Sequence, residues 1–142
     1  MEHKFVILGR LDGLNTYTAA NRTNYRKGGA MKRNNEETII WSIRQQLRGV
    51  HIDKPVLIYY RFFEPNRRRD NVKILTCPSK FVQDSLVKTH VLHDDRQRYI
   101  PHFYFDTDID QENPRIEVTL TELTAEQAKM PLATLLNDLG KR

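Results

Sequence analysis

The chain has 142 residues and a formal net charge of +5 at pH 7, with 39% hydrophobic and 29% charged residues. These values predict one folded domain and exclude an intrinsically disordered chain. No apolar run approaches the roughly 20 residues of a membrane span. The single cysteine, Cys77, excludes an intrachain disulfide and a cysteine-based zinc site, which predicts a cytoplasmic protein.

The first part of the chain is predicted to form a strand followed by a long basic loop. Branched and aromatic residues at 4–9, KFVILG, are typical of a short buried strand. The loop that follows contains Tyr17 and Tyr25 among basic residues, and a loop this long in a compact domain is usually functional or disordered. The two tyrosines either contact bases or sugars, or they anchor the loop.

A helix and a strong strand are predicted next. Asn34 is a candidate N-cap because Glu37 follows three residues later, and apolar residues at helical spacing extend this helix to Gly49. The segment VLIYYRFF at 56–63 is the strongest strand pattern in the chain.

The second half continues with alternating elements. A helix is predicted to begin at Pro78 and Ser79 and to end near His93, and it is followed by strands at 98–108 and 114–123. These strands show the period-two alternation of half-buried β-structure.

A last helix is expected after Thr124, which forms a capping box with Gln127, and Pro131 is expected to interrupt it. Together with the preceding elements, this order predicts a small α+β domain, mixed α/β in its chain order, with a mixed sheet packed by helices.

A candidate nucleic-acid site directly follows the strand at 56–63. Three consecutive arginines, Arg67, Arg68 and Arg69, precede Asp70 there. Arginines of this kind hold backbone phosphates without reading base sequence. The basic excess, with a sequence pI near 9.4, is also typical of a nucleic-acid binder. The alternatives are that the arginines form a solvated face, or that they serve as ion-pair partners of Asp70.

Carboxylates at two distant places suggest metal chemistry. Asp70 follows a strand and Asp95 follows a helix, and clustered carboxylates hold the Mg²⁺ ions that assist phosphodiester hydrolysis. Lys80 would stabilise the charge that develops on the phosphate. Simpler interpretations exist, because Lys80 and Asp84 are spaced as a helix-surface pair and Asp94 and Asp95 favour a turn.

The order of several segments resembles the RusA-type Holliday junction resolvases, a family of small phage and prophage endonucleases. The segments are GRLDGLNTY at 9–17, RRRD at 67–70, KFVQDSLVK at 80–88, VLHDD at 91–95 and PRIEVTLTEL at 114–123. The resemblance implies a RusA-like DNA-junction nuclease domain at 1–123 and leaves 124–142 as a C-terminal helical extension. It also implies a cytoplasmic homodimer that uses Mg²⁺ or Mn²⁺ to cut four-way DNA junctions.

The resemblance further implies roles for particular residues. Asp70, Lys80 and Asp95 take the places of catalytic residues, and Asp70, Asp95 and Asp94 those of metal ligands. DNA contacts are expected from the L-N-x-Y pattern and from the basic loops; the residues are Asn15, Tyr17, Arg22, Arg26, Lys27, Arg67, Arg68 and Arg69.

One position departs from the family pattern. If the helix lysine is kept in register, the family has a second acid two residues after Asp70, where this chain has Val72 followed by Lys73. If Asp70 and Asn71 are instead aligned with the last two residues of the family's D-x-D-N motif, Arg68 takes the place of the first acid, and in both registers one carboxylate is missing. Valine does not ligate Mg²⁺, and a lysine adds positive charge beside a metal. The sequence predicts a Mg²⁺-dependent endodeoxyribonuclease for branched DNA in recombination, repair or phage DNA processing. The alternative is an impaired relative that binds branched DNA without cutting it, and a third interpretation is a basic protein-binding scaffold.

Overall fold

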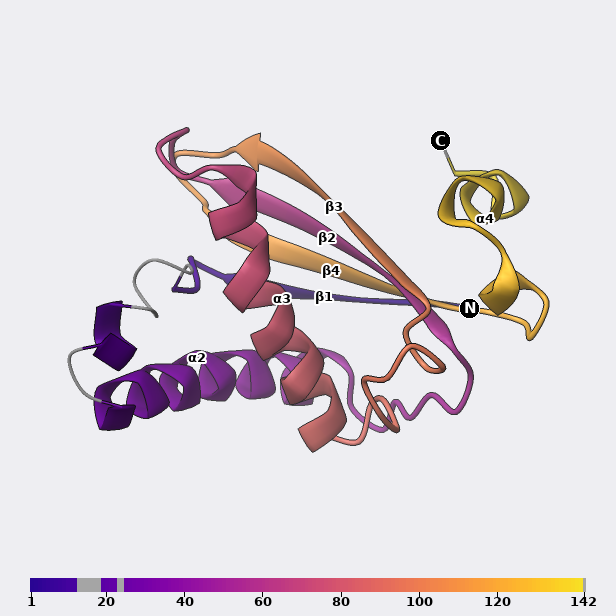
Figure 1. Cartoon of the computed structure of the whole chain (residues 1–142), viewed down its shortest axis with the longest axis horizontal. Coiled ribbons are helices and arrows are strands. Elements are labelled where there is room, and N and C mark those ends of the chain that lie inside the picture. Colours follow the sequence, from indigo (N-terminus) through magenta and orange to yellow (C-terminus); the bar gives the residue numbers. More distant parts are fainter. Residues whose placement is uncertain (13–18, 23–24, 142) are drawn as a thin grey trace.

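The computed structural model describes residues 1–12, 19–22 and 25–141, and these form a four-stranded sheet with helices packed against it (Figure 1). In chain order the elements are β1 (Glu2–Leu8), α2 (Tyr25–Gln46), β2 (Val56–Glu64), α3 (Asn71–Lys88), β3 (His102–Ile109), β4 (Arg115–Glu122), the 3₁₀ helix η1 (Gln127–Lys129) and α4 (Leu132–Asp138). The predicted α+β domain is confirmed.

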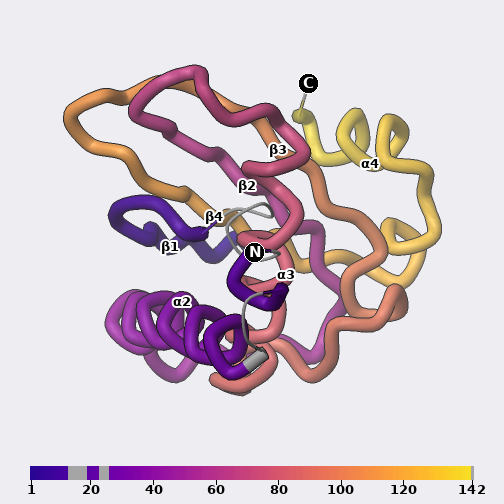
Figure 2. The backbone as a smooth tube through the Cα atoms, turned by 60° about the vertical axis from the view of Figure 1, so that its left-hand side comes forward, coloured from indigo at the N-terminus to yellow at the C-terminus, as the bar shows by residue number. Residues whose placement is uncertain are grey.

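The sheet is mixed, as expected. Its strand order is β1-β4-β2-β3, with β2 and β3 parallel and the other two neighbouring pairs antiparallel. The parallel pair needs a crossover connection, and α3 lies within it. As a result, the C-terminal ends of β1, β2 and β3 and the start of β4 lie at the same end of the sheet (Figures 1 and 2).

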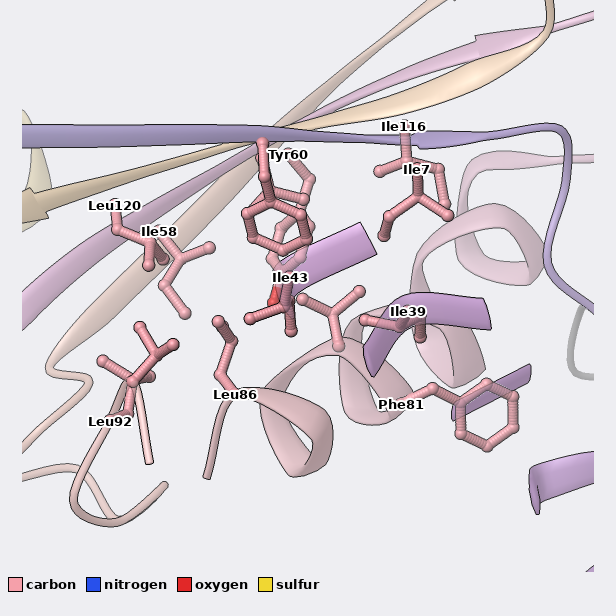
Figure 3. Close-up of a cluster of buried hydrophobic side chains, with 14 of the residues drawn as sticks. Ile7, Ile39, Ile43, Ile58, Tyr60, Phe81, Leu86, Leu92, Ile116 and Leu120 are labelled. Carbon is pink, nitrogen blue, oxygen red and sulfur yellow. The ribbon is translucent and has the colours of Figure 1, made fainter. Parts of the chain in front are cut away.

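The main core lies between one face of the sheet and the helices α2 and α3. Alternate strand residues such as Ile7, Tyr60 and Ile116 point to this face and are almost fully buried. They meet Ile43 of α2 and Leu86 of α3 in one cluster (Figure 3). Burial of a side chain of this size typically stabilises the fold by about 1.5–3 kcal/mol, so this cluster holds both helices on the sheet.

The C-terminal segment packs against the opposite face of the sheet. Leu135 of α4 and Leu123 contact Leu57 of β2 in a second, smaller buried cluster. The capping box is present, because Thr124 and Gln127 exchange backbone and side-chain hydrogen bonds. A 3₁₀ turn precedes Pro131 and α4 follows it, which confirms the expected interruption. The domain boundary at residues 123 and 124 stays a prediction.

Helix α2 begins earlier than predicted, at Tyr25 rather than after Asn34. Gly28 and Gly29 favour a loop when only the sequence is considered. In the structure both lie in the helix, and the absence of a side chain at Gly28 lets the Asn21 side chain lie close to it. A Cβ atom at Gly28 would lie 1.8 Å from the Asn21 side-chain oxygen, so only glycine fits beneath the helical turn at 19–22.

Helix α3 also begins earlier than predicted, at Asn71 rather than at Pro78 and Ser79. Asp70 is its N-cap, and Pro78 lies inside the helix despite lacking a backbone donor. Burial of Ile74, Cys77 and Phe81 on one stripe outweighs that loss. Lys80 is therefore in the middle of the helix, not near its start.

The remaining boundaries differ by a few residues. Helix α3 ends at Lys88 and not near His93, since His90 adopts a left-handed φ of 63° that the helix cannot continue through. The strand predicted at 98–108 starts only at His102, and the strands predicted at 56–63 and 114–123 are confirmed. In the described part of the chain, no helix has the length and apolar character needed to cross a membrane.

Candidate nucleic-acid interface and its charged neighbours

The segment 65–70, here called the arginine loop, connects β2 to α3 at the end of the sheet where β1, β2 and β3 terminate. It borders a pocket of about 330 Å³. The lining includes Glu64, Asn66, Arg67, Arg69, Asn71 and Thr107. Asp108, Ile74 and Ile109 complete the lining, so two arginines and two carboxylates border the pocket, and it is suited to a hydrogen-bonding group.

Arg69 is the inner residue of the arginine loop. Its two terminal nitrogens each donate to the backbone carbonyl of Leu11 at 3.2 Å, and its Nε lies 3.6 Å from Oε1 of Glu64. Glu64 is 5% exposed and also pairs with Arg10 at 3.1 Å. Burial is the main cause that lowers the pKa of Arg69. Arg69 therefore ties the loop to the segment after β1.

Arg67 and Arg68 differ from Arg69 because both are exposed. Neither forms an ion pair with any residue that the structure describes. The backbone N–H of Arg68 donates to Oδ1 of Asn66 at 3.0 Å, which shapes the turn without using the guanidinium. Both cationic side chains are therefore available to a ligand, and Arg67 also lines the pocket.

Asp70 has a structural partner in its own helix. Its Oδ1 accepts from the backbone N–H of Lys73 at 3.0 Å, and its Oδ2 lies 3.5 Å from the Lys73 ammonium. The hydrogen bond from the Lys73 backbone is the main cause that lowers the pKa of Asp70. The sequence interpretation that Asp70 pairs with the neighbouring arginines is wrong, since its cation is Lys73.

Lys80 and Asp95 are brought together by folding. Nζ of Lys80 donates to Oδ2 of Asp95 at 2.8 Å and lies 3.0 Å from Oδ1 of Asp84. These two hydrogen bonds raise the pKa of Lys80, the bond to Asp95 most. The predicted pair of Lys80 and Asp84 is present, but the simpler interpretation that Lys80 forms no more than this helix-surface pair is wrong, since Lys80 also bonds Asp95.

The Lys80 pair belongs to a larger network that the sequence did not reveal. Oδ2 of Asp84 lies 3.3 Å from Nζ of Lys32, which lies 3.7 Å from Oε1 of Glu36, and Oε2 of Glu36 accepts from Lys88 at 2.5 Å. Glu36 is only 3% exposed. The network joins α2 to α3, and acids and lysines alternate along it. Only Lys32–Glu36 and Lys80–Asp84 have helical spacing that could have suggested it.

The arrangement of the predicted metal ligands does not fit one shared ion. Ten residues of α3 separate Asp70 from Lys80, a distance of about 15 Å along the helix axis. The contact of Lys80 with Asp84 places the Lys80–Asp95 pair toward the C-terminal side of Lys80. Oxygen ligands of one Mg²⁺ ion lie about 2.1 Å from it. In residues 1–12, 19–22 and 25–141, no three His, Cys, Asp or Glu side chains form a metal-binding group.

Asp94 is not positioned as a further ligand of a shared metal ion. Its carboxylate accepts from the backbone N–H of Arg96 at 3.0 Å and pairs with the Arg96 guanidinium at 2.7 Å. The hydrogen bond from the Arg96 side chain is the main cause that lowers the pKa of Asp94. This is the turn geometry that the simpler interpretation of Asp94 predicted.

Three of the remaining predicted DNA contacts lie near the start of α2. Asn15 and Tyr17 are outside the described residues. Arg22, Arg26 and Lys27 are exposed. Their segment is linked to the end of β1, because the Asn35 amide donates to Oδ2 of Asp12 at 2.8 Å and accepts from the Asp12 backbone N–H.

No protein-family model matches this chain, and no curated protein matches it.

Proposed function

We propose that this protein binds the sugar–phosphate backbone of branched DNA through the arginine loop and is a RusA-like relative that does not cut its substrate. The observation that carries this proposal is the exposure of Arg67 and Arg68 beside a polar pocket, without an ion pair in the described part of the chain. Guanidinium groups bind phosphate oxygens in a bidentate manner. The likeness of the segment order to the RusA-type resolvases supports a branched substrate.

The absence of cutting is supported by the positions of the acids. Asp70 caps α3, Asp94 pairs with Arg96, and Asp95 pairs with Lys80. Each carboxylate already has a cation, and the helix length separates Asp70 from the other two. Val72, at the position of the family's second acid, adds no ligand.

A gel-shift titration with a synthetic four-way junction and with a linear duplex of the same length tests this proposal. We expect tighter binding of the junction, and weaker binding in the double variant Arg67→Gln/Arg68→Gln. The matched control is Arg98→Gln, which removes an exposed arginine of the segment before β3. Equal affinity for the two DNAs, or unchanged affinity in the double variant, would contradict the proposal.

Mg²⁺-dependent cleavage of junctions is a second candidate function. The contact between Lys80 and Asp95 favours it, since these are two of the three residues to which the resemblance assigns catalytic roles. If the protein cuts, the cleavage requires Mg²⁺ or Mn²⁺ and is lost in Asp95→Asn. Cleavage by that variant in EDTA would exclude the metal assignment.

The proposal includes a homodimer, because a four-way junction presents two equivalent halves. The likeness to the RusA-type resolvases of phages and prophages supports a location in the cytoplasm of a bacterial host. Light scattering coupled to gel filtration measures the oligomeric state directly, and a free protein of 16.8 kDa together with one protein chain per junction in the complex would contradict the homodimer.

A further inference from the structure

We propose that the outer face of α2 binds an unpaired DNA strand, with Trp41 stacking on a base and arginines holding the phosphates. The observation behind this is Trp41 itself, which is 63% exposed at the surface of the helix. A tryptophan is normally among the most buried residues on average, so one open to solvent on a helix is informative. The inference rests on the proposed DNA-binding function and adds a second contact surface to it.

The face around Trp41 is strongly basic. At about 100° per residue, Arg33 and Arg44 fall within roughly 80° of Trp41 around the axis of α2, and Arg48 lies just beyond the end of this helix at Gln46. All three are exposed, and none forms an ion pair with a residue that the structure describes. Glu37, one turn before Trp41 on this same face, is the one exposed acid between residues 26 and 48, and the three arginines outnumber it. The charge of this face is therefore complementary to a polyanion.

The opposite side of α2 explains why Trp41 is outside. Ile39, Ile43 and Leu47 are buried against the sheet, and the Gln46 side chain bonds the backbone of Val6 in β1. These contacts fix the rotation of the helix about its axis. Because these buried residues turn the other side of α2 toward the sheet, the Trp41 side chain points to solvent.

A groove continues the basic face beyond the end of α2. It has a volume of about 500 Å³, and its floor is apolar, with Ile43, Leu47 and Val91 among the lining residues. Arg44 and Arg48 belong to its wall together with His51 and His90. Apolar residues beside basic ones suit a base with its attached phosphate, next to the base that stacks on Trp41.

The α2 face and the arginine loop are different surfaces. The loop lies at the end of the sheet beside β3, whereas α2 runs along the other edge, next to β1 (Figures 1 and 2). One phosphate cannot contact both. The two surfaces together suit a branched DNA that has a paired arm and an unpaired segment.

Trp41 is the single tryptophan of the chain, so its fluorescence reports directly on this face. The probe is an oligothymidine of 20 nucleotides, with a duplex of equal length and heparin as comparisons. We expect the oligothymidine to quench Trp41, and we expect neither the duplex nor heparin to do so to the same extent. Stacking requires unpaired bases, which both comparisons lack.

Anisotropy of a labelled oligothymidine measures the affinity. Trp41→Ala should weaken binding about tenfold, and Trp41→Phe should retain most of it. The double variant Arg44→Gln/Arg48→Gln should weaken binding and reduce its salt dependence. Quenching should persist in Arg67→Gln/Arg68→Gln, because that variant leaves the α2 face intact.

The outcomes separate this inference from the proposed function. Absence of quenching together with unchanged affinity in Trp41→Ala overturns the inference, even if junctions still bind through the arginine loop. Equal quenching by duplex or heparin also overturns it. Quenching in a protein that shows no preference for junctions supports the inference and contradicts the proposed function.

Discussion

Lys80 and Asp95 are fifteen residues apart in the chain, yet Nζ and Oδ2 of the two side chains lie 2.8 Å from each other. Asp70 is closer to Lys80 in sequence but lies about 15 Å away along α3. The turn after α3 brings Asp95 back to the helix, whereas the rigid helix keeps Asp70 at its far end. This relationship decides how the predicted catalytic residues can cooperate.

Val72→Asp tests the consequence of this separation. Val72 is 65% exposed in the first turn of α3, so an acid there replaces no core contact and faces the helix N-terminus favourably. We expect no gain in Mg²⁺- or Mn²⁺-dependent cleavage of a labelled junction, since the new acid remains far from Asp95. Val72→Asn serves as the uncharged control. A large gain in cutting would show that DNA binding brings the acids together.

Arg69 and Arg68 are expected to differ in their effect on stability. Arg69→Gln removes one cation from the buried Glu64 and two hydrogen bonds to Leu11, so the free energy of unfolding should fall by about 1–3 kcal/mol. Arg68→Gln should change it by less than about 0.5 kcal/mol, because the side chain is exposed. Urea denaturation of both variants measures the difference, and equal effects would contradict the roles assigned here.

Gln46 is expected to protect the free edge of β1. Its side chain accepts from the Val6 N–H at 2.8 Å and donates to the Val6 carbonyl at 2.7 Å, as a neighbouring strand would. Gln46→Ala should lower the free energy of unfolding by about 1 kcal/mol and increase aggregation through the exposed edge.

Gln45→Ala is the matched control for this prediction, since Gln45 is exposed on the adjacent position of the same helix. Thermal unfolding and light scattering are the measurements. If the two variants behave alike, the bonds to Val6 do not stabilise the edge.

His51 should titrate at a higher pH than an ordinary histidine. Its ring contacts the backbone carbonyl of His90 and the carboxylate of Asp53, and these contacts raise its pKa above 6.5, the carbonyl contributing most. The protonated ring therefore stabilises the fold fully below about pH 6.5, and this contribution is lost as the pH rises through the raised pKa.

An NMR titration of the His51 ring measures this directly. Asp53→Asn should lower the pKa only in part, because the contact with His90 remains. A wild-type pKa at or below 6.5 would show that these contacts do not persist in solution.

The sequence predicted which residues belong to the candidate site, but for many of them it did not predict which other residues they contact. The arginines after the strongest strand and the pair of Lys80 with Asp84 follow from local spacing, and both lie where the pattern placed them. The role of Glu64 as the buried partner of Arg69 was not predictable, because it depends on how the strand end packs against Arg10 and Leu11. Helix α3 was misjudged because Pro78 normally marks a helix start.

By itself, the sequence determined the class of fold, most of the strands and the capped segment after Thr124, since these follow from alternation, periodicity and capping within a few neighbouring residues. Only the tertiary structure decided which charges meet. Asp95 reaches Lys80, Asp70 stays at the helix start, and Trp41 faces solvent. The physical reason is that a helix fixes distances along its axis and packing fixes its rotation, and neither is set by the residues nearby in sequence.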